Sequence, residues 1–438
     1  MLLLIVACQR QAVQEEHPES DVNTVYWGDL HAHSGLSQDG CEDPDALCLP
    51  DDALPGAHFF DNAAANGLAF AAITDHAEFV TYARPADGVS IDIWDTTRDW
   101  VRAAEGGPVI PILGYEWTAD GTRDGEDGVH RTVLLEDPEA CEAYRIRGYA
   151  QPDLKAEFPV LEDYTDNPAT PVVDAPALQA ALMAAATAPD CAASRSVSFL
   201  HHIAEAPPAA VDWSNPAFTT ASDTVVEIAS EHGSSECSDS ELPECAWRLQ
   251  RSAYVPAGSY QSALALGFRL GVVGGTDRHD ADPGKLDTDP SATAHFYDSD
   301  GDGVNDAAYP QFTTGTLTGV IAIASLDRAQ IFDALTARHT YAASWLAQGV
   351  SVQAASEDAT FLPGDEIPAG RYRITAVLDD PAVESWRAEV VDATGAALPT
   401  GTIDVVAGAA YYVRIEATVN GVEQRLWASP FFGSLVGM

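Results

Sequence analysis

Histidine and carboxylate side chains recur where apolar segments of this 438-residue chain end. The segment "GDLHAHS" carries His31 and His33, and their spacing of two points both imidazoles to one side of an extended chain. Other apolar segments end in, or lie next to, further residues of this kind: Asp75, His76, Glu116, His130, His201, His202, Asp277 and His279. Neutral imidazole and carboxylate, without thiolate, form the ligand set of Mn, Fe or Zn in multinuclear hydrolytic sites. The pattern therefore predicts a centre with more than one such ion.

Some of these residues have two interpretations. Neighbours on a strand face opposite ways, so we expect only one of His201 and His202 to bind metal, and we favour His201. Asp75 is either a ligand or a residue that orients a ligating histidine. Arg131 and Arg278 adjoin proposed ligands and could clamp a phosphate, or they could pair with the many acidic residues.

Strand-like and helix-like segments alternate over the first 300 or so residues of the sequence. Strands are predicted at Thr24–Leu30, Ala69–Thr74, Val109–Tyr115, Arg131–Leu135, Val197–Leu200, Thr224–Ala229, Leu270–Gly274 and Gly319–Ala324. Helices are predicted at His58–Asn66, Thr96–Glu105, Pro176–Ala188, Ser259–Leu266 and Asp327–Arg338, with Asp327 as an N-cap. This alternation predicts a (β/α) barrel or a doubly wound parallel sheet, in which the predicted ligands meet at the carboxyl ends of the strands.

From about Gly349 the pattern changes to short alternating strands such as "RYRITAVL" and "YYVRIEATV", separated by turn residues. This pattern predicts a small all-β, sandwich-like module. We therefore divide the chain into residues 1–20, a signal remnant and linker; residues 21–345, an α/β barrel; and residues 346–438, the β module.

The motifs "YWGDLHAHSGLSQDG", "ITDHAEF", "GYEW", "VVEIASEHGSSE", "GGTDRHD" and "LDRAQIFDALTARHTYAAS" occur in this order between about residues 24 and 345. Together they resemble the PHP superfamily, named for polymerase and histidinol phosphatase domains, and in particular a branch known mainly as a domain of unknown function. "RLWASPFF" is similar to the C-terminal β module of that branch. The resemblance implies a distorted seven-stranded (β/α) barrel of the TIM type that holds two or three metal ions and hydrolyses phosphoesters.

The resemblance also implies roles for individual residues. The implied metal ligands are His31, His33, His76, Glu116, His130, His201, Asp277 and His279, with Glu116 as a bridging carboxylate. Asp39 lies where histidinol-phosphatase-like members keep an acidic residue, although an Asp before a glycine is also common in turns. The residues expected to orient ligands or to face substrate are His202, Glu227, His232 and Glu236.

We expect a hydrolase in which metal-bound water, acidified to a pKa of about 7, provides the hydroxide that attacks a small phosphomonoester or phosphodiester. The residues expected to act in this reaction are His31, His33, Glu116, Asp277, Arg131 and Arg278. One alternative is a metal-dependent hydrolase of a carboxylic ester or amide, because the metal chemistry is shared. The other is a non-catalytic, calcium-binding surface lipoprotein.

A separate acidic segment, "DSDGDGVND", has the spacing of a calcium loop. Its predicted ligands are Asp298, Asp300, Asp302, the Val304 carbonyl and Asp306. Tyr309 stands where an EF-hand loop has its glutamate, so the segment is more similar to the shorter calcium loops of extracellular modules. A solvated acidic turn is the alternative.

The N-terminus and the cysteines suggest export. The apolar run before Cys8 is similar to the end of a bacterial lipoprotein signal, which predicts a lipid anchor at Cys8 on a periplasmic or cell-surface protein. The other six cysteines allow 15 disulfide connectivities. The short loops favour Cys41–Cys48 and Cys237–Cys245, which leaves Cys141 to pair with Cys191.

The charge balance limits the partners. The chain has 67 Asp and Glu against 22 Lys and Arg, a formal net charge of -45. Such a surface repels nucleic acid and anionic membranes, so we expect a small phosphoester substrate and membrane contact only through Cys8.

Overall fold

The computed structural model describes residues 24–37, 58–77, 79–84, 89–119, 129–148, 164–166, 172, 174–189, 194–205, 210–215, 222–239, 245, 254–286, 315–322 and 325–435. Cys8, Asp39, the Cys41 and Cys48 pair, Cys191 and the predicted calcium loop from Asp298 to Asp306 lie outside these residues. Cys237 and Cys245 are joined by a disulfide, as their spacing predicted. No helix among the described residues is long and apolar enough to span a membrane.

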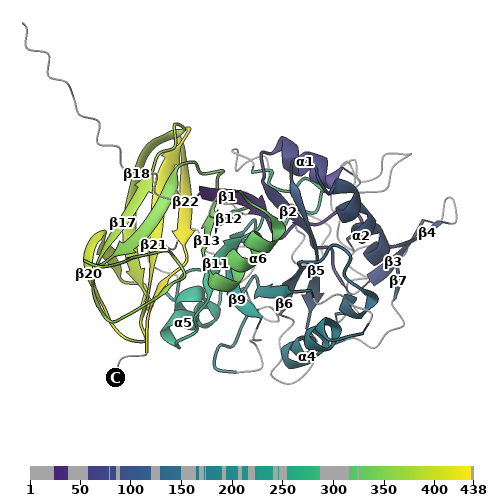
Figure 1. The fold of residues 1–438 in the computed structure, drawn as a ribbon, viewed down its shortest axis with the longest axis horizontal. Helices are drawn as coiled ribbons and strands as arrows, with labels where there is room; N and C mark the ends of the chain where they lie inside the picture. Colours follow the sequence, from purple (N-terminus) through teal and green to yellow (C-terminus); the bar gives the residue numbers. More distant parts are fainter. Residues whose placement is uncertain are drawn as a thin grey trace, which may run out of the picture.

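A mixed sheet of sixteen strands dominates the fold (Figure 1). Its first part comprises β1 (Thr24–Asp29), β2 (Phe70–Ile73), β5 (Ile110–Thr118), β6 (His130–Leu135), β8 (Ser196–Leu200), β9 (Asp223–Ser230), β10 (Gly233–Ser234), β11 (Gly271–Gly274), β12 (Leu317–Ala322) and β13 (Thr340–Ala343). The strands lie in the order β10-β9-β8-β6-β5-β2-β1-β12-β13, and β11 pairs with β9. Apolar residues fill these strands, as a sheet covered on both faces requires.

The predicted (β/α) barrel with seven strands is wrong. The described residues form only five α-helices, and the sheet is mixed: β6 runs antiparallel to both β5 and β8, while β12 runs antiparallel to both β1 and β13. The eight predicted strands each overlap an observed strand, but β10 and β13 of this sheet were not predicted. Apolar composition shows that a strand is buried, but it does not show whether its neighbour runs parallel or antiparallel, because that depends on pairing between distant segments.

The five α-helices overlap the predicted ranges: α1 (Phe59–Ala65), α2 (Ile93–Ala104), α4 (Ala175–Ala186), α5 (Tyr260–Ala265) and α6 (Arg328–Ala337). Helix α2 packs on β5, and α6 packs on β12. Asp327 caps α6 as predicted: its carboxylate accepts from the backbone N–H of Gln330, and the Gln330 side chain accepts from the Asp327 N–H. A small separate sheet of β3 (Phe79–Arg84), β4 (Val89–Asp92) and β7 (Tyr164–Asp166) lies next to α2.

All regular elements described after β13 are strands: β14 (Val350–Ala355), β15 (Thr360–Phe361), β16 (Glu366–Ile367), β17 (Gly370–Leu378), β18 (Val383–Asp392), β19 (Ala397–Pro399), β20 (Gly401–Val405), β21 (Ala410–Val419), β22 (Val422–Ala428) and β23 (Phe431–Gly433). Strand β22 pairs with β13, so the large sheet continues into this C-terminal part. Strands β15, β14, β17 and β20 form a second sheet. The two sheets share one core, in which Val352 and Ile374 lie in a cluster with Val413 and Ile415.

Candidate metal centre

Ten histidine and carboxylate residues from seven strands of the sheet, or from the segments that follow them, come together at one place. Eight of them follow strands: His31 and His33 after β1, His76 after β2, His201 and His202 after β8, His232 after β9, and Asp277 and His279 after β11. Glu116 lies within β5, and His130 is the first residue of β6. All are buried except His130, His232 and His279, which are partly buried. The sequence placed all of these side chains except His232 at or next to strand ends, and the sheet brings them together.

Glu116 lies at the centre of the first group. Its carboxylate oxygens are 2.6–3.6 Å from ring nitrogens of five histidines: His31, His33, His76, His130 and His201. Burial alone would raise the pKa of Glu116, but the surrounding imidazoles, with His76 and His201 foremost, hold it well below the usual value. Glu116 is therefore an ionised carboxylate in a dry environment, which needs positive charge close by.

Asp277 is the second buried carboxylate. Its Oδ1 lies 3.3 Å from His31 Nε2 and 3.4 Å from His33 Nε2, so Asp277 and Glu116 share these two histidines. Its Oδ2 lies 3.1 Å from the Nε2 atoms of both His202 and His232. Burial opposes ionisation of Asp277, but His31 and the other imidazoles lower its pKa well below the usual value. Asp277 has a φ of 57°, in the left-handed region that few non-glycine residues adopt.

The ligand atoms form four overlapping groups in which all atoms lie within 4.8 Å of one another. The groups are His31, His33, Glu116 and Asp277; His33, His76 and His279; His76, Glu116 and His130; and His202, His232 and Asp277. Imidazole nitrogen and carboxylate oxygen suit Mn, Fe and Zn, and the sharing of residues between groups suits neighbouring ions. These residues could therefore hold more than one divalent ion. His201, which contacts Glu116, is in none of the four groups.

His201 and His202 both contact carboxylates of this centre, although the alternation of side chains along a strand predicted that they face opposite ways and that only one binds metal. His201 Nε2 lies 3.0 Å from Glu116, and His202 Nε2 lies 3.1 Å from Asp277. His202 has a φ of 52°, so the chain leaves the extended conformation there and the alternation of side chains no longer applies. Strand β8 ends at Leu200, and an alternation argument holds only inside a strand.

Other side chains hold the ligand rings in place. Glu227 lies 2.9 Å from His31 Nδ1, the Ser37 hydroxyl lies 3.0 Å from His33 Nδ1, and Glu205 lies 3.2 Å from His232 Nδ1. Such contacts fix the tautomer and the orientation of a ligating ring. Burial raises the pKa of Glu227 to about 7, although His31 opposes this shift. Glu227 was predicted, whereas Ser37 and Glu205 were missed, since only the folded loops bring them to the histidines.

Asp75 is engaged with the loop after β1. Its carboxylate accepts hydrogen bonds from the backbone N–H of Ser34 at 2.6 Å and from the Ser34 hydroxyl at 2.7 Å. Asp75 belongs to none of the four groups of potential ligands. Its contacts favour the interpretation in which it orients the segment next to His33, one of the two roles that the sequence allowed.

The two arginines proposed as phosphate clamps are bound to carboxylates. Arg131 is buried, 3.5 Å from Asp223, and its guanidinium lies over the ring of Trp117. Arg278 Nε donates to Asp280 at 3.0 Å. Consecutive residues in β6 project to opposite faces, so Arg131 points away when His130 points to Glu116. The contacts of both arginines favour the second interpretation given above, in which they pair with acidic residues instead of binding a phosphate.

Glu236, expected near the ligands or the substrate, contacts the C-terminal strands instead. Its carboxylate accepts from the Tyr412 hydroxyl at 2.7 Å, from Trp427 Nε1 at 2.8 Å and from Arg414 Nη1 at 2.9 Å, and Arg425 Nη1 lies 3.4 Å away. These partners are on β21 and β22. Glu236 therefore joins the segment that contains His232 to the C-terminal strands.

Comparison with known proteins gives no relative: no protein-family model, curated protein or solved structure matches this chain. Similarity to the PHP superfamily stays a prediction from the motifs.

Proposed function

We propose that this protein is a metal-dependent hydrolase of small phosphomonoesters or phosphodiesters. The observation that carries the proposal is the pair of buried carboxylates, Glu116 and Asp277, which share His31 and His33 and together contact seven imidazoles. Such a density of imidazole and carboxylate is typical of sites with two or three divalent ions.

Divalent ions in this centre would polarise the ester and make bound water acidic. The part played by the chain is to bind these ions and to fix their ligands. Glu116 has one oxygen towards His130 and His201 and the other towards His31 and His33, the arrangement of a bridging carboxylate. Glu227 and Glu205 hold the rings of His31 and His232.

Several adjacent ions suit displacement at phosphorus, because both the attacking and the leaving oxygen can be stabilised. The shared ligands of the four groups support this choice of substrate class. Arg131 and Arg278 have no part in binding in this proposal, because Asp223 and Asp280 engage them. The chain has only two lysines, which argues against a polyphosphate substrate.

The test is hydrolysis by protein stripped of metal and then loaded separately with Mn, Fe or Zn. We expect turnover of p-nitrophenyl phosphate or bis-p-nitrophenyl phosphate that chelators abolish. His31→Ala and Asp277→Ala should each lower kcat at least about 100-fold, since each removes a potential ligand from the group that contains both buried carboxylates, and Asp277 belongs to a second group as well. His58→Ala is the matched control, because His58 is exposed and outside the centre.

The results separate this proposal from its alternatives. Hydrolysis of p-nitrophenyl acetate without turnover of either phosphoester would refute phosphoesters as the substrate class and favour carboxylic esters. Protein that retains no Mn, Fe or Zn after loading and dialysis would refute the metal centre itself. Unchanged activity in Asp277→Ala would show that the activity arises elsewhere.

A further inference from the structure

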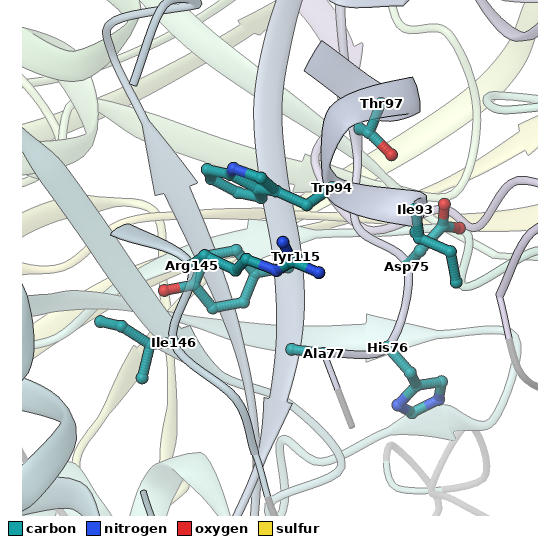
Figure 2. A pocket seen from close by; sticks show the side chains of 10 residues that line it. Asp75, His76, Ala77, Ile93, Trp94, Thr97, Tyr115, Arg145 and Ile146 are labelled. Carbon is teal, nitrogen blue, oxygen red and sulfur yellow. The ribbon is translucent and has the colours of Figure 1, made fainter. Parts of the chain in front are cut away.

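A small pocket lies beside the candidate metal centre, between helix α2 and strand β5, and we call it the α2–β5 pocket. Its volume is about 390 Å³ when the part open to solvent is included. It is lined by Asp75, His76, Ala77, Ile93, Trp94, Thr97, Gly114, Tyr115, Arg145 and Ile146. Figure 2 shows these side chains, with Asp75 and His76 at the right and Ile146 at the left. His76 belongs to both places, since its Nε2 lies 3.6 Å from Glu116 Oε2.

Three side chains that line the pocket carry buried polar atoms without partners. Trp94, Thr97 and Tyr115 are only 6%, 3% and 5% exposed. Trp94 Nε1, Thr97 Oγ1 and the Tyr115 hydroxyl have no hydrogen-bond partner among the described residues. A buried polar group without a partner destabilises the folded protein, so most such groups are paired. Three of them around one pocket indicate that a bound molecule supplies the missing partners.

The unpaired atoms select a ligand that accepts hydrogen bonds. An indole N–H can only donate, and a tyrosine hydroxyl, whose ordinary pKa is about 10, carries a proton to donate at neutral pH. Arg145 Nε is also unpaired, but Arg145 already contacts Asp92 at 2.8 Å and Glu142 at 3.1 Å. These carboxylates balance its charge, so the pocket has no unbalanced positive charge to attract an anion.

The remaining walls are apolar, with the side chains of Ile93, Ala77 and Ile146 next to the rings of Trp94 and Tyr115. We propose that the α2–β5 pocket binds an uncharged, mainly apolar group that carries a hydrogen-bond acceptor such as a carbonyl or ether oxygen. Mostly apolar pockets with a few placed polar groups are typical of small-molecule sites.

The position of the pocket allows two sources for this group. Tyr115 and Glu116 are consecutive in β5 and project to opposite faces, so the pocket lies on the other side of the strand from the Glu116 carboxylate. The backbone N–H of Ala77 donates to the Glu116 carbonyl, so the segment with His76 is a wall common to both. The occupant is either the alcohol portion of a substrate that extends past this segment or a separate small molecule. The first alternative rests on the proposed function, and the second does not.

The experiment compares two phenols of similar shape, 4-hydroxyacetophenone, which has a carbonyl acceptor, and 4-ethylphenol, which lacks the carbonyl and shares the phenolic oxygen. Binding to the full-length, metal-loaded protein is measured by calorimetry or ligand-observed NMR. We expect the ketone to bind at least about fivefold more tightly. A carbonyl oxygen accepts two hydrogen bonds at most, so at least one and at most two of the variants Trp94→Phe, Thr97→Val and Tyr115→Phe should weaken ketone binding. The expected loss is about fivefold to tenfold, the effect of one hydrogen bond, without a change in 4-ethylphenol binding.

Trp27→Phe is the matched control for Trp94→Phe. Trp27 Nε1 is also buried without a partner, but Trp27 lies in β1, outside the pocket. This variant should bind both phenols as the wild type does. Stability provides a second readout: Tyr115→Phe removes a buried hydroxyl that has no protein partner, so the Tm of the ligand-free protein should stay unchanged or rise. A purely structural hydroxyl would lower Tm on removal.

Hydrolysis of 4-acetylphenyl phosphate and 4-ethylphenyl phosphate distinguishes the two sources. If the alcohol portion occupies the pocket, a variant that weakens ketone binding also raises KM for the acetyl ester alone. If a separate molecule occupies the pocket, that variant weakens ketone binding, while the KM values of both esters stay the same. Equal binding of the two phenols to the wild type, or ketone binding unchanged in all three variants, would overturn the proposal. Retained ketone binding without any hydrolysis would refute only the proposed function.

Discussion

The contacts of Glu236 predict that one carboxylate stabilises the junction between the two parts of the large sheet. Its side chain is 1% exposed and lies among Tyr412, Arg414, Arg425 and Trp427. Loss of one partner from a buried ion pair costs about 3–5 kcal/mol, because the other charge stays buried.

The substitution Glu236→Gln preserves the shape of the side chain and removes its charge. Arg414 and Arg425 keep contacts to Glu389 and Glu416, 3.1 Å and 3.0 Å away. We therefore expect a loss near the lower end of that range, about 3 kcal/mol, in the free energy of unfolding at pH 7. Glu389→Gln is the matched control: Glu389 is 24% exposed in its contact with the same arginine, so its loss should be below about 1 kcal/mol.

Urea unfolding followed by circular dichroism measures both variants. The pH adds a second test. Burial acts to raise the pKa of Glu236, but Arg414 and Arg425 lower it below its usual value of 4.5. A lowered pKa stabilises the folded state above pH 4.5, and this contribution is lost as the pH falls through the folded-state pKa. The difference between wild type and Glu236→Gln should therefore shrink in acid. A difference below about 1 kcal/mol at pH 7 would refute the reasoning.

Three further predictions concern separate features of the molecule. Asp327→Ala removes the capping box of α6 and should cost about 1 kcal/mol in thermal or urea unfolding, whereas no loss would show that the helix end is held by packing alone. Arg131→Met removes the buried ion-pair partner of Asp223, so the free energy of unfolding should fall by about 3 kcal/mol. A rise in KM for a phosphoester at unchanged stability would instead support a role of Arg131 in phosphate binding. Removal of metal by a chelator should lower Tm, since an ion at 100 times its Kd stabilises by about 2.7 kcal/mol, and an unchanged Tm would contradict ion binding at the centre.

The sequence by itself determined the local features. Strand and helix positions followed from apolar runs and from caps such as Asp327, because these signals act between residues close in the chain. The spacing of His31 and His33 and the acidic residues at strand ends also pointed to the centre, since a side chain at the end of a buried strand reaches the edge of the sheet. The Cys237–Cys245 disulfide followed in the same way from a short loop.

Only the tertiary structure decided which distant segments pair and in which direction. The antiparallel β6 and β12, which overturn the predicted barrel, look like any other buried strand in the sequence. His202 reaches Asp277 because its backbone turns to a positive φ. Glu236 reaches Arg414 because β21 pairs with β22, which in turn pairs with β13. Such contacts join residues tens to hundreds of positions apart, and their geometry comes from the packing of the whole sheet, which no local pattern contains.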